Sequence, residues 1–85
     1  MKANKLLEKL KDYMGAKRRA QLARYDSIKR VLKKLKKKEN SLKEKLKKEH
    51  SDKTTKRLKK EMAVLSAQRK KGMKMLKELK EAKKS

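Results

Sequence analysis

The sequence predicts an all-α protein: a coiled-coil-like antiparallel helical hairpin with an N-terminal helical extension. Proline is absent, and most residues are strong helix formers such as Lys, Leu, Glu, Ala, Met and Arg. The leucines recur every three or four residues, which is the spacing of one helix face. Acidic residues stand four positions before basic ones, as Asp26 does before Arg30, and this orientation stabilises a helix. These patterns outweigh the high charge, which by composition alone would indicate disorder.

The first element that the sequence predicts is a short amphipathic helix over residues 1–14. Its apolar side chains share one face and comprise Leu6, Leu7, Leu10, Tyr13 and Met14. The pattern changes just after Gly15, which we interpret as a helix end or a kink. The alternative is one continuous helix from the N-terminus to His50, with Gly15 tolerated inside it.

A long helix is predicted over residues 16–50 and a second one over residues 52–83. The polar segment between them offers Ser51 or Asp52 as the residue that caps the second helix. Each helix carries an apolar stripe with steps of three and four residues, which is typical of a helix that packs on another helix. The stripes comprise Ile28, Leu32, Leu35, Leu42 and Leu46 in the first helix, and Leu58, Met62, Leu65, Leu76 and Leu79 in the second.

Folding the two long helices antiparallel about residue 52 brings apolar positions opposite each other along one seam. Gly72 then falls opposite Leu32, and we interpret it as a position of close approach between helices. Glu39 and Arg69 also fall in the seam within about a turn of each other. We predict an ion pair between them, which specifies register more than it adds stability.

A second apolar stripe on the last helix, formed by Val64, Ala67, Met75 and Ala82, predicts a second neighbour. That neighbour is either the N-terminal helix, which gives a three-helix bundle, or another copy of the chain, which gives a dimeric four-helix arrangement. Few large apolar residues are present to offset chain entropy in one 85-residue domain. We therefore expect a homodimer.

Composition gives little support to catalysis or metal binding. The chain has one His and no Cys, and no glycine-rich phosphate loop is present. His50 lies beside the predicted turn, where a solvated helix-end residue is the simplest interpretation. We predict that the protein is not an enzyme, and we expect no cofactor and no metal site.

The charge is the strongest functional signal in the sequence. The chain has 32 basic and 10 acidic residues, for a net charge of +22, whereas a small soluble domain needs a magnitude of only about 2–8. Positive charge is in excess in each of the segments 1–27, 28–50 and 51–85. A polyanion is the natural partner of such a body, and nucleic acid is the strongest biological polyanion because binding releases its condensed counterions.

The kind of basic residue predicts how the nucleic acid is contacted. Only six of the basic residues are Arg; Lys acts as a flexible point charge, whereas Arg reads bases and phosphates through paired hydrogen bonds. Trp and Phe are absent, and Tyr13 and Tyr25 fall on apolar faces, so base stacking of the single-strand-binding kind is not expected. The sequence therefore predicts largely sequence-independent binding to duplex DNA or folded RNA, of the nucleoid-associated or ribosome-associated type.

The predicted contact residues lie on the faces away from the seam. The group richest in arginine should make the most directed contacts and comprises Lys17, Arg18, Arg19, Arg24 and Arg30. The others are Lys33, Lys34, Lys36, Lys37, Lys38, Lys45, Lys47, Lys48, Lys56, Arg57, Lys59, Lys60, Lys70, Lys71 and Lys74.

Two alternatives remain open. A coiled-coil adaptor or assembly factor that binds an acidic protein would also use the seam, and a basic amphipathic helix can lie on an anionic membrane surface. The membrane alternative is weakened by the lack of Trp and Phe anchors. No run of about 18 apolar residues exists to span a bilayer, and residues 1–14 lack the apolar block of a signal peptide. We expect a cytoplasmic, nucleoid or nuclear protein.

Overall fold

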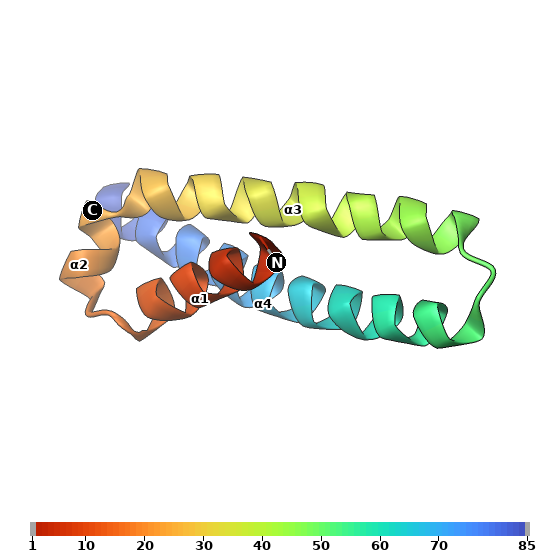
Figure 1. The fold of residues 1–85 in the computed structure, drawn as a ribbon. Coiled ribbons are helices and arrows are strands. Elements are labelled where there is room, and N and C mark those ends of the chain that lie inside the picture. Colours follow the sequence, from red (N-terminus) through yellow and green to blue (C-terminus); the bar gives the residue numbers. More distant parts are fainter. Residues whose placement is uncertain (1, 85) are drawn as a thin grey trace.

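The fold is a long helical hairpin with two shorter helices packed at one end. The computed structural model describes the backbone of residues 2–84 and the side chains of residues 5–84. It consists of α1 (Lys2–Gly15), α2 (Arg18–Ala23), α3 (Tyr25–Lys48) and α4 (Asp52–Lys84), with no strand among the described residues. Figure 1 shows α3 and α4 antiparallel and side by side. The predicted all-α hairpin with an N-terminal helical extension is confirmed.

The seam between α3 and α4 is made of the residues that the sequence predicts. Ile28, Leu35 and Leu79 have no exposed surface. Leu32, Leu42, Leu58 and Leu65 are buried as well, whereas Leu46, Met62 and Leu76 are half-buried and pack against the same cluster. The molecule measures 50 × 19 × 15 Å, a length close to that of a 33-residue helix at about 1.5 Å per residue.

The predicted ion pair lies within this seam. The Nε atom of Arg69 donates a hydrogen bond to Oε2 of Glu39 at 2.8 Å, and the Glu39 side chain is only 9% exposed. The Glu39 side chain is therefore largely removed from water beside Arg69. The predicted ion pair is confirmed, and it joins α3 to α4 between residues thirty positions apart in the sequence.

The helix α1 packs against both long helices, but only over one end of the hairpin (Figure 1). Its Leu10 side chain has no exposed surface. Gly72 is the point where the three helices meet, because a Cβ atom placed there would lie 2.6 Å from Cδ2 of Leu32 and 3.0 Å from Cδ1 of Leu10. The close approach predicted at Gly72 is confirmed, and the absent side chain is what lets α1 sit this close to α4.

The segment 16–50 differs from the sequence prediction of a single helix. The helix α1 ends at Gly15, as predicted, but the chain is then extended at Lys17, with φ −66° and ψ 153°. It kinks again at Arg24, with φ −105° and ψ 16°, and this kink separates α2 from α3. The chain has to reverse between α1 and α3, and the short helix α2 makes that reversal.

A polar side chain closes the end of α1. The amide nitrogen Nε2 of Gln21, in α2, donates to the carbonyl oxygens of Tyr13 at 2.9 Å and Met14 at 3.3 Å. The last carbonyls of a helix have no partner within it, and Gln21 is buried. Gln21 thus caps α1 from the next helix.

The turn between the long helices is built from Glu49, His50 and Ser51. One carboxylate oxygen of Glu49 accepts hydrogen bonds from the backbone N–H groups of His50 at 3.1 Å and Ser51 at 3.0 Å. The hydroxyl of Ser51 accepts from the Thr54 N–H at 3.5 Å, at the start of α4. Of the two capping residues that the sequence offers, Ser51 is therefore the one used.

The second apolar stripe of α4 is only partly covered. Met75 is buried in the core, but Val64 is 51% exposed, and Ala67 and Ala82 are exposed too. The neighbour at Met75 is the N-terminal part of the chain, since Met14 lines the same hollow. One chain thus forms a bundle at one end and a two-helix hairpin at the other, and the expected homodimer stays a prediction.

Candidate nucleic-acid interface

The predicted contact residues form a basic coat around the hairpin. They lie on α2, α3 and α4, with Lys17 and Arg24 in the two interruptions. All of them are exposed except Lys38, which is half-buried. The apolar stripe occupies the inner face of each long helix, so the helical period sends the lysines outward. The ammonium groups are therefore within reach of a partner along the whole rod.

Two of these residues take part in ion pairs on the surface. Nη2 of Arg18 lies 3.8 Å from Oε1 of Glu78, and Nζ of Lys47 lies 3.7 Å from Oε1 of Glu44. Each side chain is more than half exposed, and exposed pairs of this kind contribute at most about 1 kcal/mol. Both cations can exchange their carboxylate for a phosphate at little cost.

The group richest in arginine does not form one continuous helix face. Arg18 and Arg19 lie in α2, Arg24 lies at the kink, and Arg30 lies in α3. Arg18 is also drawn toward α4 by Glu78. The structure therefore places this group at the blunt end of the rod, where α2 crosses from α1 to α3 (Figure 1).

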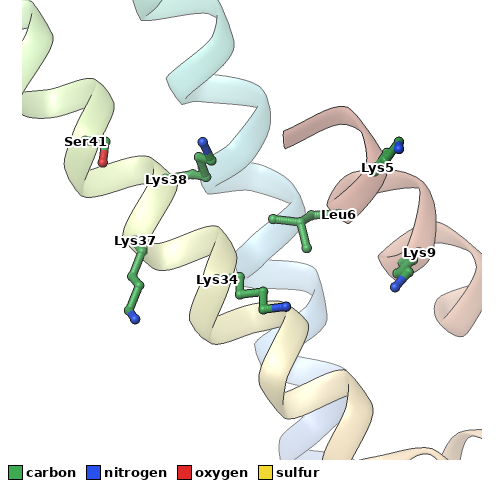
Figure 2. Close-up of a pocket in the computed structure, with 7 residues that line it drawn as sticks. All are labelled: Lys5, Leu6, Lys9, Lys34, Lys37, Lys38 and Ser41. Carbon is green, nitrogen blue, oxygen red and sulfur yellow. The ribbon is translucent and has the colours of Figure 1, made fainter. Parts of the chain in front are cut away.

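A lysine-rimmed groove runs between α1 and α3. We call it the α1–α3 groove; Lys5 and Lys9 of α1 and Lys34, Lys37 and Lys38 of α3 line it. Figure 2 shows Leu6 of α1 and Lys34 of α3 pointing into the space between the two helices, whereas Lys5 and Lys37 point away from it. No acidic side chain is among the described residues that line this groove. An apolar floor with an ammonium rim suits long lysine stems, which lie along apolar surface and hold the charge in water.

A second lysine-rimmed groove runs between α3 and α4. We call it the α3–α4 groove; its basic residues are Lys29 of α3 and Lys74, Lys77 and Lys80 of α4. Its floor includes Tyr25, Met73 and Leu76, and Met73 is 47% exposed. The described residues lining this groove again include no acid.

Two further basic surfaces are less enclosed or less uniform. Lys56, Arg57, Lys59 and Lys60 form a cluster on the first turns of α4. Arg18, Lys71 and Lys74 share a hollow with Glu78. The carboxylate of Glu78 lowers the attraction of this hollow for an anion, in contrast to the two grooves.

The grooves contain five lysines that are absent from the sequence prediction: Lys5, Lys9, Lys29, Lys77 and Lys80. Composition gave no reason to prefer these lysines to any others. The position of α1 over α3 decides which lysines become neighbours, and a helical wheel drawn for one helix at a time does not contain that position. A wheel for the whole hairpin could have placed Lys29 near Lys77 and Lys80.

The tyrosines and the single histidine are placed as the sequence predicts. Tyr13 and Tyr25 are half-buried and pack against the core, and Nζ of Lys83 lies 4.4 Å from the centre of the Tyr25 ring. His50 is exposed in the turn. Within residues 5–84, no group of three or more His, Cys, Asp or Glu side chains could hold a metal ion.

The chain matches no family model, no curated protein and no solved structure in the comparisons with known proteins. Among the helices of residues 2–84, none has both the length and the apolar character needed to cross a membrane.

Proposed function

We propose that this protein binds nucleic acid by contacting phosphates through its lysine-rich helix faces, without reading the bases. One observation carries this proposal: the predicted basic residues, all exposed but Lys38, follow α2, α3 and α4 along a rod 50 Å long, and the described residues that line its two lysine grooves include no acid. A rod of this length lies beside about 30 phosphates of a B-form duplex. A chain of charge +22 placed along it releases condensed counterions.

The proposed mode of contact is positioning by phosphates alone. Lysine ammonium groups approach phosphates as point charges and carry no base information. The half-buried tyrosines are engaged in the core, so stacking on splayed bases has no support here. The partner is accordingly a duplex DNA or a folded RNA with a regular phosphate surface, and the working compartment is the one that holds it, the cytoplasm, nucleoid or nucleus.

The test is a salt titration of binding. Fluorescence anisotropy is recorded with two unrelated duplexes of about 20 base pairs, between about 50 and 200 mM salt. The expected result is a fall in affinity of about 10³ to 10⁵ over that range, which corresponds to about six to ten phosphate contacts. The two sequences should differ by less than about threefold in Kd, or 0.7 kcal/mol.

Two parallel measurements distinguish nucleic-acid binding from the two alternatives, which are binding to an acidic protein and binding to an anionic membrane. Polyglutamate, of the same charge as the duplex, represents an acidic protein surface, and vesicles of phosphatidylcholine and phosphatidylglycerol represent an anionic membrane. The proposal expects both to bind at least about tenfold more weakly than duplex, or 1.4 kcal/mol. A salt-independent affinity for duplex, or tighter binding to polyglutamate, contradicts it in favour of the adaptor function.

A further inference from the structure

The two lysine-rimmed grooves lie on opposite sides of the same helix. Lys38 lines the α1–α3 groove and Lys29 lines the α3–α4 groove. They are nine residues apart on α3, which at 3.6 residues per turn is about two and a half turns and hence opposite faces. Val31 and Leu35, between them in the sequence, point into the core. The grooves are therefore separated by the body of α3.

A duplex seated lengthwise along one groove lies on one side of α3. The rod is 19 × 15 Å in cross-section, whereas duplex DNA bends smoothly only over a persistence length of about 150 base pairs. To reach the second groove, a duplex seated along the first would have to wrap around a rod that is far thinner than this persistence length. The second groove thus stays open when the first is filled.

An open lysine groove remains a strong site for a second polyanion. Four lysines line the α3–α4 groove and five line the α1–α3 groove, with no acid among the described lining residues of either. Each groove can release counterions from its own duplex because the contacts are made by different side chains. Filling the first groove lowers the net positive charge of the complex and so reduces its long-range attraction for a second duplex. Binding of the second duplex therefore depends on the lysines of the open groove.

We propose that a single chain bridges two duplex segments, one seated along the α1–α3 groove and the other along the α3–α4 groove. This inference rests on the proposed function, since it specifies how many nucleic-acid segments the same basic surface takes. It assigns the protein to cross-linking or compacting duplexes, in addition to coating them. It gives α1 a role in binding, because Lys5 and Lys9 complete one groove from the N-terminal helix.

The test is capture of a second duplex. One duplex of about 20 base pairs, somewhat longer than the rod, is fixed to beads, and a fluorescent duplex of unrelated sequence is added with the protein at low salt. Wild-type protein is expected to retain the fluorescent duplex. Sedimentation of the soluble complex is expected to give one chain for two duplexes. Two or more chains for two duplexes, as a bridging homodimer would give, would overturn bridging by a single chain.

Matched variants show whether the grooves make the bridge. The triple variants Lys5→Gln/Lys9→Gln/Lys34→Gln and Lys29→Gln/Lys77→Gln/Lys80→Gln each remove three exposed lysines from one groove. The control Lys11→Gln/Lys43→Gln/Lys53→Gln removes the same charge at three exposed lysines that lie outside both grooves and outside the predicted contact residues. We expect each groove variant to keep anisotropy-detected binding of one duplex but to lose second-duplex capture at least about tenfold. The control should lose less than threefold.

The outcomes separate this inference from the function it rests on. Equal loss of capture in all three variants would mean that total charge and not the grooves joins the duplexes, which overturns the inference. Binding of one duplex by wild type without capture of a second overturns it as well and leaves the proposed function standing. Failure of wild type to bind any duplex at low salt overturns both. Unchanged circular dichroism of each variant establishes that its helices are intact.

Discussion

Gln21 reaches back from α2 and donates its amide N–H to the Tyr13 carbonyl at 2.9 Å, and so holds α1 against the rest of the molecule. The contact also reaches the Met14 carbonyl at 3.3 Å. It lies at the point where the chain leaves α1, so it acts together with the buried Leu10 to hold the N-terminal helix in place. The same orientation brings Lys5 and Lys9 to the α1–α3 groove.

Replacement of Gln21 by Met should loosen α1. The Gln21→Met variant keeps a similar volume but removes the side-chain donor to the Tyr13 and Met14 carbonyls, of which the Tyr13 carbonyl keeps the backbone N–H of Ala16 at 3.2 Å. A lost hydrogen bond at a partly buried site costs about 1–2 kcal/mol. Urea denaturation followed by circular dichroism measures the change. An unfolding free energy equal to that of wild type would show that water replaces the cap without penalty.

Replacing one partner of the Glu39–Arg69 pair should lower the free energy of unfolding more than replacing both partners. Arg69→Leu leaves a carboxylate that is 9% exposed without its cation, and the expected loss is about 2–3 kcal/mol of unfolding free energy. Adding Glu39→Leu should recover most of it, because an apolar pair fits a helix seam as well as an ion pair does. A double-mutant cycle in urea measures the coupling. Additive losses would argue against a direct interaction.

The two glycines form a matched pair for testing the close approach at α4. Gly15→Ala meets no atom within 4 Å and its φ is not positive, so it should stabilise the protein by about 0.4–1 kcal/mol through the unfolded chain. Gly72→Ala gains similar helix propensity but places its Cβ atom 2.6 Å from Leu32, which is itself buried. Overpacking of a core costs about 1–3 kcal/mol.

We therefore expect Gly72→Ala to be less stable than Gly15→Ala by at least about 1 kcal/mol, a difference of roughly 4–8 °C in Tm for a domain of this size. Thermal unfolding followed by circular dichroism measures it. Equal Tm values in the two variants would mean that Leu32 of α3 and Leu10 of α1 do not lie as close to Gly72 as the structure has them.

Salt should act in opposite directions on folding and on binding. A net charge of +22 repels itself in the compact state, and added salt screens that repulsion, since the Debye length falls from about 10 Å at 0.1 M to about 3 Å at 1 M. The free protein should thus gain stability as salt rises, while its affinity for duplex falls. Urea midpoints recorded across that salt range test the first half. A midpoint that falls with salt would indicate that surface ion pairs dominate over repulsion.

The hairpin could be predicted from the sequence because its determinants are local and periodic. The stripe from Ile28 to Leu46 has one helical phase, Ser51 is a standard capping residue, and the antiparallel register follows once Leu32 is set opposite Gly72. The same register brings Glu39 within about a turn of Arg69, and the structure places Oε2 of Glu39 2.8 Å from Nε of Arg69.

The kink at Arg24 and the cap by Gln21 could not be predicted in this way. Residues 18–23 are good helix formers with no breaker after them, so local preference favours a continuous helix there. The packing of α1 on both long helices requires the chain to turn, and this tertiary demand overrides local preference. The make-up of each groove depends on the same packing, which is why a count of basic residues does not single out Lys5 or Lys29.

Because α1 covers only one end of the hairpin, the backbone at the two ends of the rod should differ in its resistance to local unfolding. Ser41 still lines the α1–α3 groove. Beyond it, α3 packs on α4 and not on α1, and Leu46 and Met62 in this part are half-buried. At the other end Leu10, Ile28 and Leu79 are sealed from water. Amide hydrogens near the turn should consequently exchange with deuterium long before those of the covered end. Local unfolding should therefore begin at the turn between α3 and α4, while the end covered by α1 stays folded.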